Sequence, residues 1–114
     1  MSKDLSVGIL MDFYGELLTD KQRDTLDLYY NRDYSLAEIA QDIDISRQGV
    51  RDFIKRGEKQ LIEFEEKLGM VRKYDLISSK IQSIENIIDS NSTVIAKSVN
   101  EDIKKILESI KEEL

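Results

Sequence analysis

Apolar residues recur at helical intervals over most of this chain. From Val50 to Leu68 they lie 4, 3, 4, 3 and 4 residues apart, and the same series repeats from Met70 to Ile88. Such spacing places apolar side chains on one face of a helix. The chain also lacks proline and is rich in Leu, Ile, Glu and Lys, which favours helices over sheets. The sequence therefore predicts an all-α protein. The two predicted stripes are Val50, Ile54, Gly57, Leu61, Phe64 and Leu68, then Met70, Tyr74, Ile77, Ile81, Ile84 and Ile88.

A first helix is predicted from about Lys3 or Asp4 to Leu18. Aromatic residues on apolar helical faces usually pack in a core, so we interpret Phe13 and Tyr14 as core residues rather than as platforms for nucleic-acid bases. The predicted buried stripe consists of Leu5, Ile9, Phe13 and Leu17.

A second helix is predicted from Asp20 to about Asn31. Thr19 is followed three residues later by Gln22, which is the spacing of a capping box. The residues expected to point inward are Leu26, Tyr29 and Tyr30.

The segment from Ser35 to Lys59 has the spacing of a helix-turn-helix. Ser35 with Glu38 forms a second capping box, which predicts a short helix from Leu36 to Asp42. Ser46 is a further N-cap, so the next helix should begin at Arg47. The apolar residues expected to fix the angle between the two helices are Ile39, Ile43, Ile45, Val50 and Phe53.

The face opposite the stripe of the second of these helices carries side chains suited to reading DNA. Arginine can bond a guanine edge, glutamine an adenine edge and lysine a phosphate. A charged face on an amphipathic helix can also be merely solvated, and the helix-turn-helix spacing favours the binding interpretation. Lys21 and Arg23, near the start of the helix predicted from Asp20, are further candidates for phosphate contact. The predicted DNA-binding residues are Arg47, Gln48, Arg51, Lys55, Arg56 and Lys59.

Gly69 follows Leu68, the last residue of the first long stripe, and predicts a helix end in the left-handed conformation. We therefore divide the chain into a helix-turn-helix domain, residues 1–69, and a C-terminal helical extension, residues 70–114. A turn at Asp89–Ser92 should fold the extension into a helical hairpin. Its narrow apolar stripes could pack on the first domain or on a second chain, which makes it a candidate dimerisation element and favours a homodimer. The stripe of the last helix consists of Ala96, Val99, Ile103, Ile106 and Ile110.

The chain is acidic overall, but one segment is basic. The formal net charge is -6, whereas residues 46–60 alone carry 5 basic and 2 acidic groups. Because phosphate binding depends on Lys and Arg, we expect weak, salt-dependent binding by one copy and useful affinity when two copies act together.

The chemistry needed for catalysis is largely missing. The chain has neither Cys nor His, and it has no glycine-rich phosphate loop. Asp42, Asp44 and Ser46 resemble the start of a calcium loop, but Arg47 and Phe53 occupy the positions of its glycine and its last glutamate. We expect no enzymatic activity, no metal and no cofactor. Neither a membrane span nor a signal peptide is predicted, which favours the cytoplasm.

The stretch from Asp12 to Leu68, DFYGELLTDKQRDTLDLYYNRDYSLAEIAQDIDISRQGVRDFIKRGEKQLIEFEEKL, closely resembles the YlxM family of small bacterial proteins. Its most specific parts are LLTDKQR, DYSLAEIA and ISRQGVRDFIKR. It is also similar to the fourth region of bacterial σ factors. The resemblance implies a σ region 4-like helix-turn-helix and a DNA-binding regulator linked to the signal recognition particle pathway. The alternative is a non-enzymatic accessory factor that binds RNA or protein of that particle.

Overall fold

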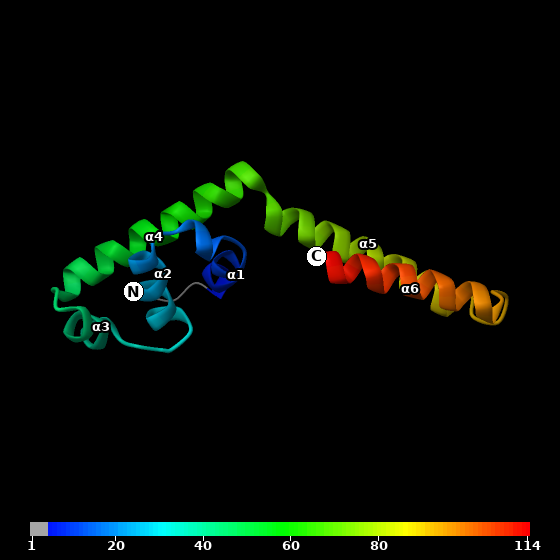
Figure 1. Ribbon diagram of the computed structural model, residues 1–114, viewed down its shortest axis with the longest axis horizontal. Coiled ribbons are helices and arrows are strands. Elements are labelled where there is room, and N and C mark those ends of the chain that lie inside the picture. Colours follow the sequence, from blue (N-terminus) through cyan, green and yellow to red (C-terminus); the bar gives the residue numbers. More distant parts are fainter. Residues whose placement is uncertain (1–4) are drawn as a thin grey trace. The chain divides into compact units, whose positions relative to one another are not determined.

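The computed structural model describes the backbone from residue 5 and the side chains from residue 6 to the end of the chain, and the described part is helical without strands (Figure 1). The all-α prediction is confirmed. The elements are α1 (Leu5–Tyr14), the 3₁₀ turn η1 (Gly15–Leu17), α2 (Asp20–Tyr30), α3 (Leu36–Ile43), α4 (Arg47–Leu68), α5 (Met70–Ser90) and α6 (Lys97–Glu113). They form two compact units, one ending at Val71 and one from Arg72 to Leu114.

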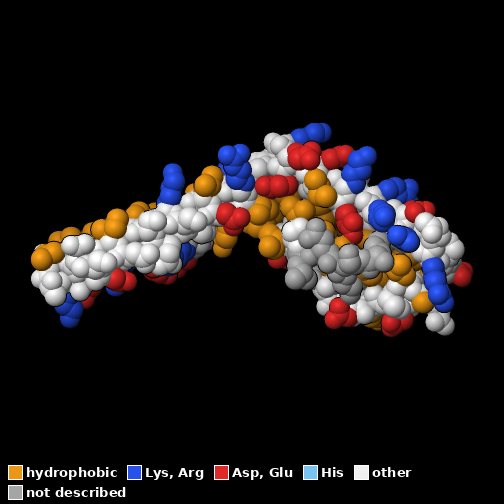
Figure 2. All heavy atoms as spheres, turned by 180° about the vertical axis from the view of Figure 1, so that it is seen from behind, with side chains coloured by type: hydrophobic (Ala, Val, Ile, Leu, Met, Phe, Trp, Pro, Cys, Tyr) orange, Lys and Arg blue, Asp and Glu red, His pale blue; other side chains and the backbone are white. Residues whose placement is uncertain are grey.

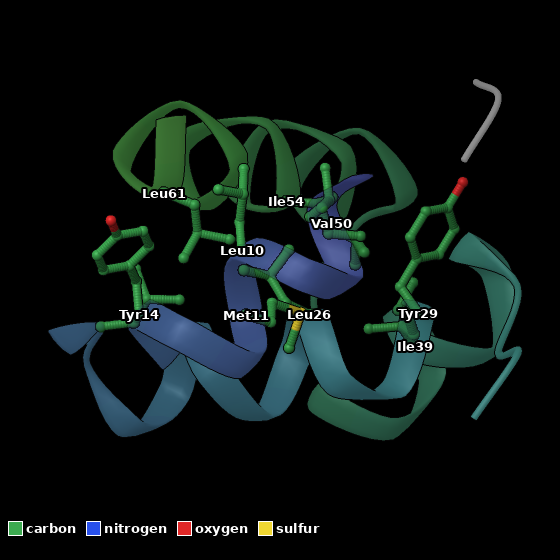
Figure 3. Close-up of a cluster of buried hydrophobic side chains, with 12 residues drawn as sticks. Leu10, Met11, Tyr14, Leu26, Tyr29, Ile39, Val50, Ile54 and Leu61 are labelled. Atoms are coloured by element: carbon green, nitrogen blue, oxygen red, sulfur yellow. The ribbon is translucent and has the colours of Figure 1, made fainter. Parts of the chain in front are cut away.

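The first unit, here called the helix-turn-helix domain, is built around α4, which packs against α1, α2 and α3. Side chains from all four helices meet in one core (Figure 3). Leu26, Ile39 and Ile54 are completely buried there. Gly57 allows α4 to approach α2 closely, because a Cβ atom at this position would lie 2.8 Å from Cδ1 of Leu26.

The predicted stripe of α1 is wrong except at Phe13, which is partly buried and packs against the core. Ile9 is 51% exposed and Leu17 is 57% exposed, and the side chain of Leu5 lies outside the described residues. Two sets of apolar residues have helical spacing on this segment, and tertiary packing buries mainly the set that was not predicted. The α-helix also ends at Tyr14, earlier than predicted, and the tighter 3₁₀ turn shifts Leu17 off the stripe. The buried residues are Val7, Leu10, Met11, Tyr14 and Leu18.

The inward residues of α2 follow the prediction: Leu26 and Tyr29 are buried, and Tyr30 is partly buried. In α4 the stripe is buried from Val50 to Leu61. Leu68, in contrast, is 48% exposed. The stripe is thus one turn longer than the core that covers it.

Within the helix-turn-helix domain, hydrogen bonds from α1 and α4 hold the first two residues of α5, Met70 and Val71. α4 ends at Gly69, which has a φ angle of +61° as predicted for a left-handed cap. The hydroxyl group of Tyr14 donates to Oε1 of Glu65 at 2.6 Å and accepts the N–H of Met70 at 2.9 Å. The same Glu65 oxygen accepts the N–H of Val71 at 3.0 Å. Two free N–H groups at the start of α5 are therefore satisfied by α1 and α4.

The second unit is a helical hairpin made of α5 and α6. Three residues, Ile81, Ile88 and Leu107, form its buried core, with Ile95 and Ile103 packed beside them. Two ion pairs join the helices: Lys104 to Asp89 at 3.4 Å and Lys111 to Glu85 at 2.6 Å.

The predicted turn of the hairpin begins too early. α5 continues to Ser90, because the side chains of Ser90 and Asn91 donate back to the carbonyl groups of Asn86 and Ile87. The buried face is also narrower than predicted. Leu107, which was not among the predicted residues, is buried, because contact between two helices covers only part of each apolar stripe. The predicted stripe residues that remain more than a third exposed are Met70, Tyr74, Ile77, Ile84, Ala96, Val99, Ile106 and Ile110.

None of the helices in the described chain has both the length and the apolar character that crossing a membrane requires.

Candidate nucleic-acid interface

The turn between α3 and α4 is defined by two side-chain caps. Oγ of Ser35 accepts the N–H of Glu38 at 3.0 Å, and the Glu38 carboxylate accepts the N–H of Ser35 at 3.2 Å. Oγ of Ser46 then accepts the N–H of Gly49 at 3.0 Å, so α4 begins at Arg47 as predicted. Between them Asp44 has a φ angle of +56°, in the left-handed region that Asp tolerates better than most residues. α3 ends one residue later than predicted, at Ile43.

α3 supports α4 through a small apolar contact. Ile39 and Val50 are fully buried, and Ala40 is 9% exposed. Ile43 is partly buried against the same core. Ile45 was predicted to contribute but is 38% exposed, because it follows the left-handed Asp44 and lies at the rim of the turn.

A row of cations leads along the exposed side of α4. Arg47, Arg51, Lys55 and Lys59 follow one another at intervals of four residues, and all are exposed. Within the described chain, none of the four makes an ion pair. Residues four apart are neighbours on a helix surface, so these charges form one ridge, and blue side chains follow α4 in Figure 2.

Arginines elsewhere in the domain are used differently. Arg32 pairs with Asp27 at 3.3 Å, and Arg23 pairs with Asp20 at 3.3 Å and Asp24 at 3.7 Å. Their charges are therefore compensated locally, and Arg23 is not presented to a ligand in the way that the ridge on α4 is.

Gln48 and Asp52 lie on the same exposed side of α4. The Gln48 amide donates to Oδ1 of Asp52 at 2.9 Å. An adenine edge would have to replace this hydrogen bond, and the Asp52 carboxylate lowers the positive charge of the surface. Gln48 is thus a weaker candidate for base contact than the arginines beside it.

Lys21 and Arg56 both lie over the ring of Phe53. The Lys21 Nζ atom is 5.9 Å from the ring centroid, and the Arg56 guanidinium carbon is 5.6 Å from it. Both distances allow a cation–π interaction. A shallow groove between the start of α2 and α4 includes these three residues, together with Lys59. The sequence suggested each charge but gave no sign that Phe53 holds two cations from different helices together.

The basic surface is limited to the first part of α4. From Arg47 to Lys59 the helix rises about 18 Å, at 1.5 Å per residue. Beyond it come Glu63, Glu65 and Glu66. About three turns of one helix therefore carry the charge that a polyanion would contact. Across the described residues there is no group of three or more Asp and Glu side chains placed to hold a metal ion.

Residues 1–106 match the family UPF0122, described as "Putative helix-turn-helix protein, YlxM / p13 like". The chain belongs to the UPF0122 family. A UPF0122 protein of Thermoanaerobacter sp. strain X514 is 46% identical over 110 residues, which cover 96% of this chain and 92% of the relative. A UPF0122 protein of Acetivibrio thermocellus is 46% identical over 114 residues, covering 100% of this chain and 95% of the relative. Another, from Halalkalibacterium halodurans, is 42% identical over 110 residues, covering 96% and 95%.

The family assignment confirms the predicted resemblance to YlxM proteins and the helix-turn-helix. UPF0122 is a helix-turn-helix family rather than an enzyme family. The DNA-binding residues predicted on α4 stay a prediction, to which the geometry adds Phe53 as the ring that lies under Lys21 and Arg56.

Proposed function

We propose that this UPF0122 protein binds double-stranded DNA and acts as a regulator, with the first three turns of α4 in a major groove. The observation that carries this proposal is the row of four exposed cations without ion pairs on α4. The groove admits an α-helix, and the row is short enough for one turn of the duplex.

The side chains divide into two roles. Arg47 and Arg51 lie nearest the start of α4, where helix-turn-helix proteins read base edges. Lys55, Lys59 and the pair of cations on Phe53 contact phosphates and set the position of the helix. Gln48 reads a base only when its bond to Asp52 is broken.

The affinity for DNA depends on the salt concentration and on how many copies of the protein bind together. With a net charge of -6, the chain is repelled by DNA at long range, and only the α4 surface attracts it. We expect a steep loss of binding with increasing salt, and useful affinity when two copies bind neighbouring half-sites. A homodimer would present two α4 helices in this way.

Fluorescence anisotropy with a pool of random DNA duplexes at low and moderate salt tests the proposal. Arg51→Glu with Lys55→Glu should weaken binding by at least tenfold, since it places two negative charges against phosphates. The control, Lys67→Glu with Lys97→Glu, changes the net charge equally at exposed residues that do not belong to the row and should weaken binding about twofold or less.

Equal losses in both double variants would contradict a site on α4. The alternative function, an RNA- or protein-binding factor of the signal recognition particle, predicts a preference for the particle's RNA, or binding to neither nucleic acid. Either result in the same measurement would overturn the DNA proposal.

A further inference from the structure

The hairpin carries an apolar face that its own two helices leave open. We call it the open face. Its members are between 39% and 63% exposed: Ile77, Ile84 and Ile87 of α5, and Val99, Ile106 and Ile110 of α6. Figure 2 shows hydrophobic side chains as a nearly continuous row along one edge of this hairpin.

Helical geometry places these residues on the same side of the hairpin. At about 100° per residue, Ile84 lies about 40° from the buried Ile88, and Ile106 about 100° from the buried Leu107. Viewed along the chain, the open residues of each helix are rotated about the helix axis in the same direction from the buried ones. Because α5 and α6 are antiparallel, the same direction of rotation in both helices brings the open residues to one face of the hairpin. The six side chains therefore form a single surface.

The hairpin core is too small to support two long helices by itself. Only Ile81, Ile88 and Leu107 are buried. Units of this size normally need a metal, disulfides or association with another chain. The chain has no cysteine, so a disulfide is excluded. Association through the open face would supply the missing core.

We propose that the open face binds the same face of a second copy, so that two hairpins form a four-helix bundle in which α5 of one copy lies against α6 of its partner. This names the surface behind the two-copy binding proposed above, although it does not depend on DNA. Side chains of these sizes and exposures form a patch on the order of 500 Å², near the upper limit for monomeric proteins. With its polar rim, such a patch approaches the roughly 800 Å² per partner of a stable interface.

The charges at the edges of the open face indicate how the two hairpins are arranged in the dimer. On the opposite side of the hairpin, acids of α5 pair with lysines of α6 within the chain. Beside the open face the signs are reversed: Lys80 lies at the α5 edge and Glu113 at the α6 edge, both exposed. Within the described chain neither makes an ion pair. A surface with opposite charges on its two edges is complementary to itself when α5 faces α6.

The register of the hairpin brings matching residues together. Glu85 lies level with Lys111, and Asp89 with Lys104, so Lys80 is nearly level with Glu113 and Ile87 with Ile106. A two-fold axis along the hairpin keeps these levels in the dimer. Lys80 of one copy then meets Glu113 of its partner, and the two most exposed isoleucines of the open face meet each other. Packing α5 on α5 would instead oppose lysines.

Sedimentation equilibrium of the full chain without DNA, at protein concentrations from 1 to roughly 100 μM, a range in which interfaces of this size normally associate, tests the proposal. Wild-type protein should reach twice the chain mass. Ile106→Glu should weaken association at least a hundredfold, because it would bury a charge in the interface. Val94→Glu makes a comparable change at the hairpin turn, where Val94 is 77% exposed, and should leave the mass unchanged.

A wild-type chain that stays monomeric throughout, or an Ile106→Glu chain that remains a dimer, would overturn the proposal. Loss of hairpin helicity together with loss of the dimer supports it, because the bundle completes the core. DNA is absent, so these outcomes are independent of the function proposed for α4.

A charge exchange tests the orientation. Lys80→Glu alone and Glu113→Lys alone should each weaken the dimer by roughly twofold to fivefold, the range of exposed ion pairs. The double exchange should restore wild-type affinity if α5 faces α6. Additive losses in the double variant would overturn this arrangement.

Discussion

α4 and α5 have the same spacing of apolar residues but different surroundings. In α4, the stripe from Val50 to Leu61 is covered by α1, α2 and α3 of the same chain. In α5, Ile81 and Ile88 are buried, while Ile77 and Ile84 on the same stripe remain exposed. Periodicity thus determines that a helix has an apolar face, but the rest of the chain determines whether that face is covered.

The largest expected difference between the two units is in their response to loss of a core side chain. Leu26→Ala should lower the free energy of unfolding of the helix-turn-helix domain by about 3–5 kcal/mol, because the buried site cannot collapse around the cavity. Ile88→Ala should act on the hairpin alone. Urea unfolding followed by circular dichroism, at a concentration that favours monomers, measures both. Equal weakening of a single transition would show that the units do not unfold independently.

A smaller effect compares two positions within the helix-turn-helix domain, one where helices approach closely and one where they do not. Gly57→Val should cost about 1–3 kcal/mol, because its first carbon would already lie 2.8 Å from Leu26. Gly8→Ala is the matched control in α1, where a Cβ atom meets nothing within 4 Å. It should stabilise the domain by about 0.5–1 kcal/mol through helix propensity. The same urea titration gives both values, and a neutral Gly57→Val would contradict the tight α2–α4 contact.

The smallest expected effect concerns pH and the hydrogen bonds that Tyr14 makes with Glu65 and Met70. Burial, followed by the hydrogen bond to Glu65, raises the pKa of Tyr14 above its ordinary value of 10.0. Since the fold favours the neutral phenol, its contribution is complete below about pH 10 and is lost as pH rises through the pKa of the folded state. The temperature of thermal unfolding should therefore fall less steeply between pH 8 and about pH 11 for Tyr14→Phe than for wild type. Parallel profiles would exclude this contribution.

Local signals predicted the starts of α2, α3 and α4 correctly. Thr19, Ser35 and Ser46 each cap the helix that follows, because capping depends on residues only three positions apart. Gly69 ends α4 for an equally local reason. The exposed positions of Arg47 to Lys59 followed from the stripe on the opposite side of α4.

Features that depend on distant residues were missed. The stripe of α1 was ambiguous, because both sets of apolar residues have helical spacing. Leu107 became a core residue only through contact with α5. The sequence suggested Lys21 as a phosphate contact, but its position over Phe53 depends on how α2 packs on α4. Such pairings between helices cannot be obtained from the spacing within one helix.

The charged side chains are distributed unevenly along α4, so they give the helix a dipole along its axis. Cations occupy its beginning up to Lys59, and Glu63, Glu65 and Glu66 follow. The peptide dipole has the same polarity, with its positive end at Arg47. A polyanion therefore exerts a torque on the domain and turns the start of α4 toward itself before contact. Encounters would be oriented during diffusion, and a higher ionic strength would slow association by removing this alignment as well as by weakening the attraction.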